Sequence, residues 1–378
     1  MKVLFAIAAI AFFATPVAVL VVGVKAEPFE NRALAEAPSL DDGWNVFDQT
    51  TRFLTDRMPL REEAVRANTR ISQDLFDTTP RYGRGGGRGL PFAGPGSGGP
   101  KVRDLEGFRV ATGRDGWLYL ADEADRSCTP PFPGTAAVRR WRELLGIVQA
   151  SGRSAAVVVP PNKYTIYPEH LALDAAKRRC AKRGGEALWN LIESVPRREN
   201  LIGLREPLLS LRRSLGEPVY LRTDSHWTAR GAFELVTATL ERVGRGVRAT
   251  PRELVDLGTE KAQGDLNRLV GNPTPERRRR LVVKRGPAAR KVPGRTVFVL
   301  DSFGEKVTEM LRPYFETFEI VYWNRERKTS PARLAAAVER ADTVIFETVE
   351  REFAFRASNR EQVNAAFLER LRTGLSKR

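Results

Sequence analysis

Any reaction that needs an imidazole base has two candidates in this chain, because the sequence holds only His170 and His226. His170 ends the proline-bearing segment 167–170, which carries no nucleophile, and we expect a surface or satisfied loop residue there. His226 lies between an expected strand at 219–221 and an expected helix at 228–243. This position predicts a base at a turn on the carboxyl edge of an α/β sheet.

Asp224 lies two residues before His226 in the same expected turn. Its carboxylate can accept a hydrogen bond from the imidazole Nδ1 and leave Nε2 free to take a proton. The alternative is structural, with Ser225 or Thr228 capping the following helix and Asp224 complementing the helix dipole. This segment alone leaves both interpretations open.

Ser302 is the candidate nucleophile, because VFVLDSFG at 297–304 has the pattern of a buried strand that ends in a polar turn before a helix. The hydroxyl needs a base, and backbone N–H groups of a helix starting near Gly304 can stabilise an oxyanion. A serine N-cap is the structural alternative. Two such turns in one sheet, carrying Asp-x-His and Asp-Ser, favour the catalytic interpretation.

Short apolar runs alternate with helical periods from Phe108 onward, which predicts a βαβ sheet covered on both faces. We expect buried strands at 155–159, 296–300, 320–323 and 343–346 and helices at 137–150, 187–195, 305–312, 331–340 and 358–374. A chain of 378 residues can bury a sizeable core.

The N-terminal 1–25 segment contains the apolar run Val3–Val24, close to the ~20 residues of a spanning helix. It predicts a single-pass membrane anchor, or alternatively a cleaved signal peptide, with an extracytoplasmic catalytic domain in the periplasm or outside the cell. Residues 26–79 are interpreted as a helical stalk, 80–104 as a flexible Gly/Pro-rich insert and 105–378 as the catalytic domain.

The formal net charge of +16 favours an acidic partner. The densest positive block, Glu276 to Arg280, is expected to be a solvated loop, with contact to an anionic polymer or to lipid headgroups as the alternative. Nucleic acid is disfavoured by export and by the lack of a recognised nucleic-acid module. No metal-binding or nucleotide-binding motif occurs, so neither a metal nor a cofactor is expected.

Cys128 and Cys180 are the only cysteines, and an even count in an exported chain favours one disulfide. Two buried thiols are the alternative. A bridge closing a loop of ~50 residues contributes roughly 4 kcal/mol to stability.

The two motif blocks resemble those of the alginate O-acetyltransferase family of the AlgX/AlgJ type, SGNH hydrolase-like proteins in which Asp-x-His precedes the serine. The likeness extends to ENRALAEAP at 30–38, VVVPPNKYTIYP at 157–168, GDL at 264–266 and FETVER at 346–351. It implies a three-layer, flavodoxin-like domain with a central parallel sheet, preceded by the anchor and stalk.

The resemblance implies that Asp224, His226 and Ser302 transfer acetyl groups to hydroxyls of an exported or cell-wall polysaccharide through an acetyl-serine. A membrane-bound O-acyltransferase would supply the acetyl group. An acetylesterase with the same triad and a non-catalytic glycan-binding scaffold remain alternatives.

SGNH esterases also use a Gly-x-Asn-Asp block, and the matching strand end here has no asparagine. The Ser302 N–H is therefore the first expected oxyanion donor, with Arg351 and Asn162 as side-chain candidates. Trp227 either packs behind the imidazole or stacks on a sugar.

Overall fold

The computed structural model describes residues 101–105, 108–271, 274–323 and 329–376. The expected anchor and stalk and most of the Gly/Pro-rich insert lie outside these ranges. No helix within them is long and apolar enough to cross a membrane. Residues 101–104, assigned to the insert from the sequence, belong to strand β1 (Lys101–Leu105).

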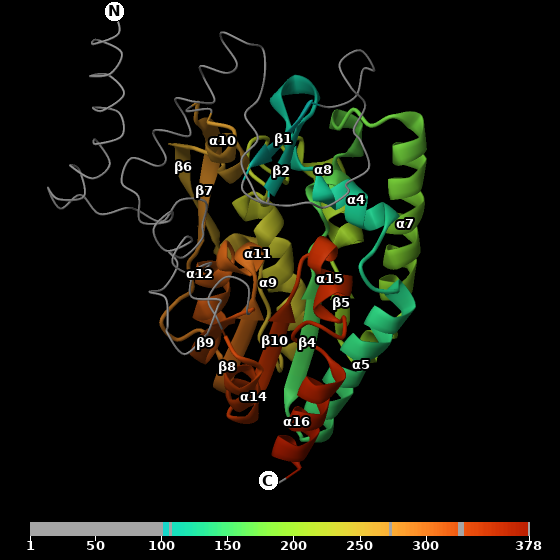
Figure 1. The fold of residues 1–378 in the computed structure, drawn as a ribbon. Coiled ribbons are helices and arrows are strands. Elements are labelled where there is room, and N and C mark those ends of the chain that lie inside the picture. The colour runs from blue at the N-terminus through green and yellow to red at the C-terminus, as the bar shows by residue number, and fades with distance from the viewer. Residues whose placement is uncertain (1–100, 106–107, 272–273, 324–328, 377–378) are drawn as a thin grey trace, which may run out of the picture. The chain divides into compact units, whose positions relative to one another are not determined.

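A five-stranded parallel sheet forms the centre of the fold (Figure 1). Its order is β5 (Leu201–Gly203), β4 (Ser154–Val159), β10 (Thr343–Glu347), β8 (Val292–Leu300) and β9 (Phe315–Tyr322). Every neighbouring pair is parallel. The segments that follow β4, β8 and β10 therefore meet at one edge of the sheet, which brings Asn162, Ser302 and Arg351 to the same side.

Successive strand residues point to opposite faces, so each face has its own apolar core. Val157 and Val299 pack beneath α5 (Gly134–Ala150), α14 (Pro331–Glu339) and α16 (Ala365–Leu375). Val158 and Phe298 pack on the other face, against α8 (Arg205–Leu215), α9 (Ala229–Val243) and α12 (Thr308–Leu311). This arrangement confirms the three-layer α/β fold with a central parallel sheet that the sequence predicted.

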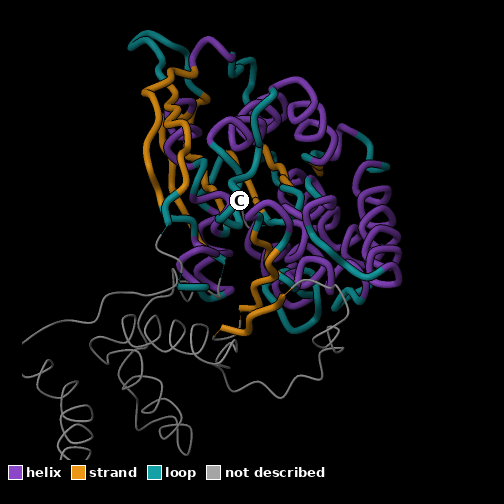
Figure 2. Tube along the Cα trace, turned by 90° about the horizontal axis from the view of Figure 1, so that it is seen from above, coloured by secondary structure: helices purple, strands orange, loops and turns teal. Residues whose placement is uncertain are grey.

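Two smaller antiparallel sheets flank the central one. The first contains β1, β2 (Phe108–Thr112) and β3 (Leu118–Leu120), and the second pairs β6 (Leu254–Ala262) with β7 (Glu276–Val283). Viewed from above, β6 and β7 lie at the left of Figure 2, and the long helix α7 (Ala175–Glu193) lies at the right. The remaining helices are α4 (Asp122–Cys128), α6 (Lys163–Ile166), α10 (Asp265–Leu269), α11 (Ser302–Glu305) and α15 (Glu350–Arg356).

Several local predictions are wrong. The arginine block at 276–280 is not a loop but the start of β7, whose first four side chains alternate between half-buried and exposed. Residues 219–221 form no strand of the central sheet, because Tyr220 makes only an isolated bridge to Trp227 as the chain turns back. The helix expected at 305–312 is interrupted after Glu305, and the one expected at 358–374 begins only at Ala365.

Candidate active site

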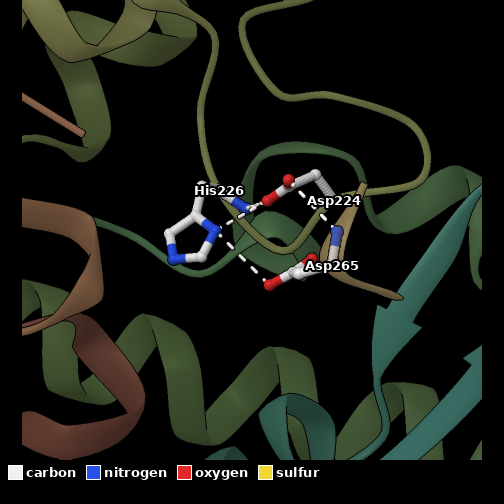
Figure 3. A group of neighbouring side chains, drawn as sticks. All are labelled: Asp224, His226 and Asp265. Carbon is white, nitrogen blue, oxygen red and sulfur yellow. Dashed lines mark hydrogen bonds and ion pairs between the residues drawn. The ribbon is translucent and has the colours of Figure 1, made fainter. Parts of the chain in front are cut away.

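His226 lies in the loop between α8 and α9 and is almost completely buried. Its Nδ1 lies 2.6 Å from Asp224 Oδ1, and the same oxygen accepts the His226 backbone N–H at 2.9 Å (Figure 3). Thr228, not Asp224, caps helix α9, by accepting the Gly231 N–H. The Asp224 carboxylate is thus used on the imidazole and fixes Nδ1 as the proton-bearing nitrogen.

A second carboxylate, Asp265, lies beside the pair at the start of α10. Its Oδ2 is 3.4 Å from His226 Nδ1 (Figure 3). Its two oxygens also accept the Ser225 N–H at 2.6 Å and the Ser225 hydroxyl at 2.5 Å. The Asp265 N–H in turn donates to Asp224 Oδ2 at 3.3 Å. Asp265 therefore holds both the loop and its carboxylate in place.

This role of Asp265 was not predicted from the sequence, in which the residue is part of the GDL block at 264–266. Its neighbour Gly264 gives the physical signal: a Cβ there would lie 2.1 Å from the Thr223 carbonyl oxygen. Only glycine lets the two backbones approach so closely. The block therefore marks the point where a distant segment packs onto the His226 loop.

The three ionisable groups change one another's proton affinity. Burial by itself lowers the pKa of His226, but the charge of Asp224 and the hydrogen bond between them raise it by more, so the pKa lies above its usual value. Burial by itself raises the pKa of Asp224, but the charge of His226 and its hydrogen bonds lower it by more. The pKa of Asp224 is therefore strongly lowered overall. Burial and the nearby Asp224 charge raise the pKa of Asp265. His226 is therefore a stronger base than a free imidazole.

The same three side chains are the described group that could hold a metal ion, since their ligand atoms lie within 4.8 Å of one another. The imidazole atom nearest to both carboxylates is Nδ1, which already bonds to Asp224. The arrangement therefore matches an oriented base more closely than a set of open ligands.

Lys163 fixes the His226 loop through hydrogen bonds to backbone carbonyl oxygens. Its buried Nζ donates to the carbonyl oxygens of Leu118 at 2.7 Å, Arg222 at 2.7 Å and Asp224 at 3.0 Å. Burial lowers the pKa of this ammonium group to about 8. Because Lys163 directly follows Asn162, one short segment after β4 both contacts the His226 loop and carries the candidate oxyanion donor.

Ser302 is the first residue of α11, directly after β8 and Asp301. The Phe303 N–H donates to Asp301 Oδ1 at 3.0 Å, and the Gly304 N–H donates to Glu347 Oε2 at 3.1 Å. The expectation that this helix start offers several N–H groups is therefore corrected. Within the described ranges, neither the N–H nor the hydroxyl of Ser302 has a hydrogen-bond partner.

Phe303, the residue after the candidate nucleophile, links the parts of the site. Its ring centroid lies 4.9 Å from that of His226 and 5.4 Å from that of Trp227, and the Arg351 guanidinium carbon lies 5.2 Å from it. His226 Nε2 is buried and has no hydrogen-bond partner in the part of the chain described. Phe303, which follows Ser302 in the chain, thus packs against His226, and within the described ranges no hydrogen bond joins Ser302 Oγ to His226 Nε2.

Asn162 and Arg351 are brought together by a hydrogen bond from the Arg351 N–H to Asn162 Oδ1, 3.2 Å long. Both line a cavity of about 240 Å³. The bond occupies the amide oxygen of Asn162, so its Nδ2 is the amide atom that can act as a donor. Arg351 Nη1 is buried without a hydrogen-bond partner among described residues and lies 3.9 Å from Glu123 Oε1, whose pKa burial raises to about 7.

The other predicted residues lie outside the reacting group. Trp227 is 3% exposed and packs edge-on against Phe303. His170 stacks on Trp117 with ring centroids 4.6 Å apart. A disulfide joins Cys128 at the end of α4 to Cys180 in α7, with Cα atoms 5.2 Å apart. None of the three contacts the Asp224 carboxylate in the structure's described part.

Residues 110–292 match the family model of the SGNH hydrolase-like domain of the acetyltransferase AlgX. The match includes Asp224 and His226 and ends before Ser302. Among curated proteins, the chain is 28% identical over 148 residues to a probable alginate O-acetylase AlgJ of Pseudomonas aeruginosa, covering 37% of this chain and 34% of that protein. It is 29% identical over 145 residues to the Pseudomonas putida protein of the same name, covering 36% and 34%. The chain thus matches about a third of these relatives' length.

Two solved structures are also similar. The O-acetyltransferase domain of Pseudomonas putida AlgJ shares 19% identity at a TM-score of 0.47, over 70% of this chain and 98% of that one. Bacillus cereus PatB1 shares 11% identity at a TM-score of 0.42, over 68% and 98%. The family-model match over residues 110–292 and the sequence relatives thus support an SGNH hydrolase-like domain of the AlgX/AlgJ type in this chain.

Proposed function

We propose that the chain is a polysaccharide O-acetyltransferase that uses Ser302, His226 and Asp224 and passes through an acetyl-serine. The observation that carries the proposal is the state of His226. Its Nδ1 is held by a carboxylate at 2.6 Å, its buried Nε2 has no partner in the described ranges, and its ring packs against Phe303. A purely structural histidine would have its second nitrogen satisfied.

In the first half of the reaction, Ser302 Oγ attacks the acetyl carbonyl of a donor ester while His226 Nε2 takes the hydroxyl proton. The Ser302 N–H stabilises the oxyanion, with Asn162 Nδ2 and Arg351 as further donors. Collapse breaks the donor's C–O bond, and the leaving alcohol takes the proton from His226. The products are acetyl-Ser302 and a neutral imidazole.

In the second half, His226 takes the proton of an acceptor hydroxyl, whose oxygen attacks the acetyl-serine. Collapse of the second intermediate releases the acetylated acceptor, and His226 returns the proton to Ser302. Asp224 stays ionised throughout and stabilises the imidazolium in both halves.

The acceptor is an exported or cell-wall glycan, and a cleft beside the His226 loop supports an anionic one. This cleft of about 580 Å³ is lined by Leu221 and Thr228 and by five arginines. Arg278 pairs with Glu260, and Arg279 pairs with Glu217 and Asp256. The other three, Arg222, Arg230 and Arg277, form no ion pair within the described ranges and suit the carboxylates of an acidic sugar chain.

We further propose that a membrane-bound O-acyltransferase donates the acetyl group and that residues 1–25 anchor the chain as a single-pass protein. The catalytic domain would then face the periplasm or the outside of the cell. The apolar run in that segment supports the anchor.

Mass spectrometry after incubation with p-nitrophenyl acetate tests the chemistry. We expect acetyl on Ser302 in the wild type and none in Ser302→Ala. Adding an acidic uronate oligosaccharide or a neutral glucan then separates the functions. Acetyl on the acidic oligosaccharide supports the proposal, release of acetate alone supports an esterase, and absence of acetyl-Ser302 contradicts both.

A further inference from the structure

Glu347 is a buried carboxyl group that the proposed reaction does not use. It ends β10, next to the strand that carries the nucleophile, and is 0% exposed. Its Oε2 accepts two backbone N–H groups, from Asp301 at 2.9 Å and from Gly304 at 3.1 Å. One oxygen therefore holds the turn on both sides of Ser302.

The Asp301 carboxylate also fixes the Ser302 turn by accepting backbone N–H groups. Its Oδ1 accepts the Phe303 N–H, and its Oδ2 accepts the Val349 N–H at 3.1 Å. The N–H groups of Asp301, Phe303 and Gly304 are thus all occupied by carboxyl oxygens. Of the four consecutive N–H groups in this turn, only that of Ser302 lacks an acceptor in the described structure.

The charges around Glu347 balance only if it keeps its proton. Arg356 Nη2 lies 3.4 Å from Asp301 Oδ2, both side chains are buried, and together they make a neutral pair. No ion pair to Glu347 exists within the described ranges, and its buried Oε1 has no hydrogen-bond donor there. An ionised Glu347 would leave one uncompensated negative charge in the core. Burial, followed by the Asp301 charge, raises the pKa of Glu347 well above its usual value.

We infer that Glu347 is a positioning residue that works as a neutral carboxylic acid: it fixes the Ser302 turn and leaves the Ser302 N–H as the turn's free oxyanion donor. The inference rests on the proposed function, because it assigns a partner to that nucleophile. Neutrality has a purpose here, since a second negative charge beside the turn would oppose the negative charge that forms on the acyl oxygen.

The test compares three variants in the full chain by their rate of labelling with a fluorophosphonate probe and by the p-nitrophenyl acetate burst. Glu347→Gln keeps a neutral side chain of the same shape, whose carbonyl oxygen can accept both N–H groups. Glu347→Ala removes the acceptor and leaves two buried N–H groups unpaired. Ile345→Ala, in the same strand and also buried, controls for the loss of volume.

We expect Glu347→Ala to slow labelling about 100-fold at saturating probe, with little change in the half-saturating concentration, because the nucleophile is misplaced. Glu347→Gln should restore the rate to within about threefold of the wild type, a change of ~0.7 kcal/mol in the barrier. Ile345→Ala should lower the melting temperature without slowing labelling of the folded protein.

Two results would overturn the inference. The first is labelling at the wild-type rate in Glu347→Ala, which would mean that the conformation of the Ser302 turn does not depend on Glu347. The second is a Glu347→Gln variant that labels about 100-fold more slowly than the wild type, which would mean that a negative charge is required. This result can be interpreted even if Glu347→Ala does not fold. A wild-type protein that never labels on Ser302 refutes the proposed function instead.

Discussion

The His226 loop and the Ser302 turn, called below the base loop and the nucleophile turn, are both held by buried carboxyl groups. The carboxyl groups of the two segments differ in charge state. At the base loop, Asp224 is ionised and bonds directly to the reacting imidazole, whose pKa it raises. At the Ser302 turn, the carboxyl groups of Asp301 and Glu347 accept hydrogen bonds from backbone N–H groups and Asp301 also pairs with Arg356, while the raised pKa of Glu347 favours its neutral form.

The difference follows from the charge that each side must stabilise. In the proposed reaction His226 becomes positive, so a fixed negative charge beside it lowers the barrier. In the same proposal the acyl oxygen at Ser302 becomes negative, so carboxyl groups there are tolerated only if neutralised by a proton or by an arginine. The same residue types can therefore serve opposite electrostatic needs within one site.

Removing either reacting group should have the largest effect. Ser302→Ala and His226→Ala should each abolish acetyl-enzyme formation, because one lacks the nucleophile and the other leaves its proton without an acceptor. The double variant should lose little more than either single variant, since the two residues act as a unit. Intact-protein mass spectrometry measures the acetyl adduct, and wild-type acylation in His226→Ala would refute the mechanism.

Asp224→Asn tests the charged side of the comparison directly. We expect turnover to fall by about 10³ to 10⁴, because the imidazolium loses its anionic partner and the imidazole can adopt the wrong tautomer. His226 must be neutral to act as a base, so wild-type activity should rise with pH through a pKa above 6.5.

The pH profile of Asp224→Asn provides its control. The substitution removes the charge that raises the His226 pKa, so the rising limb of kcat/KM should move to lower pH as the maximum falls. An unchanged limb would show that another group controls the ionisation.

Asp265→Asn should have a smaller effect of the same sign. Asp265 lies 3.4 Å from Nδ1 and mainly fixes Ser225, so we expect a loss of about tenfold in kcat, or ~1.4 kcal/mol, and a slight shift of the limb to lower pH. Stopped-flow acylation measures the rate. A loss as large as that of Asp224→Asn would make Asp265 an equal partner of the imidazole.

Replacing Cys128 and Cys180 by serine should act on neither turn. The bridge spans 52 residues, and its loss should lower the free energy of unfolding by about 4 kcal/mol in the chain-entropy model. Urea denaturation measures the change. The folded double variant should label Ser302 at the wild-type rate, and slower labelling would connect α4 to the site.

His170→Ala should have the smallest effect. Its ring stacks on Trp117, away from both turns, so acylation should stay at the wild-type rate and stability should fall by roughly 1 kcal/mol. Parallel acylation and thermal melts check both. Slower acylation would indicate that His170 also acts as a base, so the His226 loop would not be the sole source of the base.

The central sheet could be predicted from sequence because its strands are buried on both faces and therefore form continuous apolar runs, such as 155–159 and 343–346. Strand β5 was missed because three residues carry no periodicity. Strand β7 was missed because its arginines resemble a solvated loop, while their pairing partners lie in β6.

The residues of the site were predictable where chemistry and turn signals coincide, as at His226 and Ser302. The supporting residues were not, because their signal is a contact between distant segments: Asp265 lies 39 residues after His226 and Glu347 lies 45 after Ser302. In the sequence Glu347 is only one letter of the FETVER block at 346–351, whose strand end lacks the asparagine of SGNH esterases. Its two bonds to the turn become visible once β10 pairs with β8.

The order of the strands also sets when the site can assemble as the chain is made. Strand β10 lies between β4 and β8 but is synthesised after all other strands of that sheet. Until residues 343–347 emerge, the β5/β4 pair and the β8/β9 pair have no shared neighbour, and the Ser302 turn lacks Glu347. Such long-range pairing makes for slow folding. The nucleophile should therefore become reactive at the very end of folding, so a nascent chain carries no active serine.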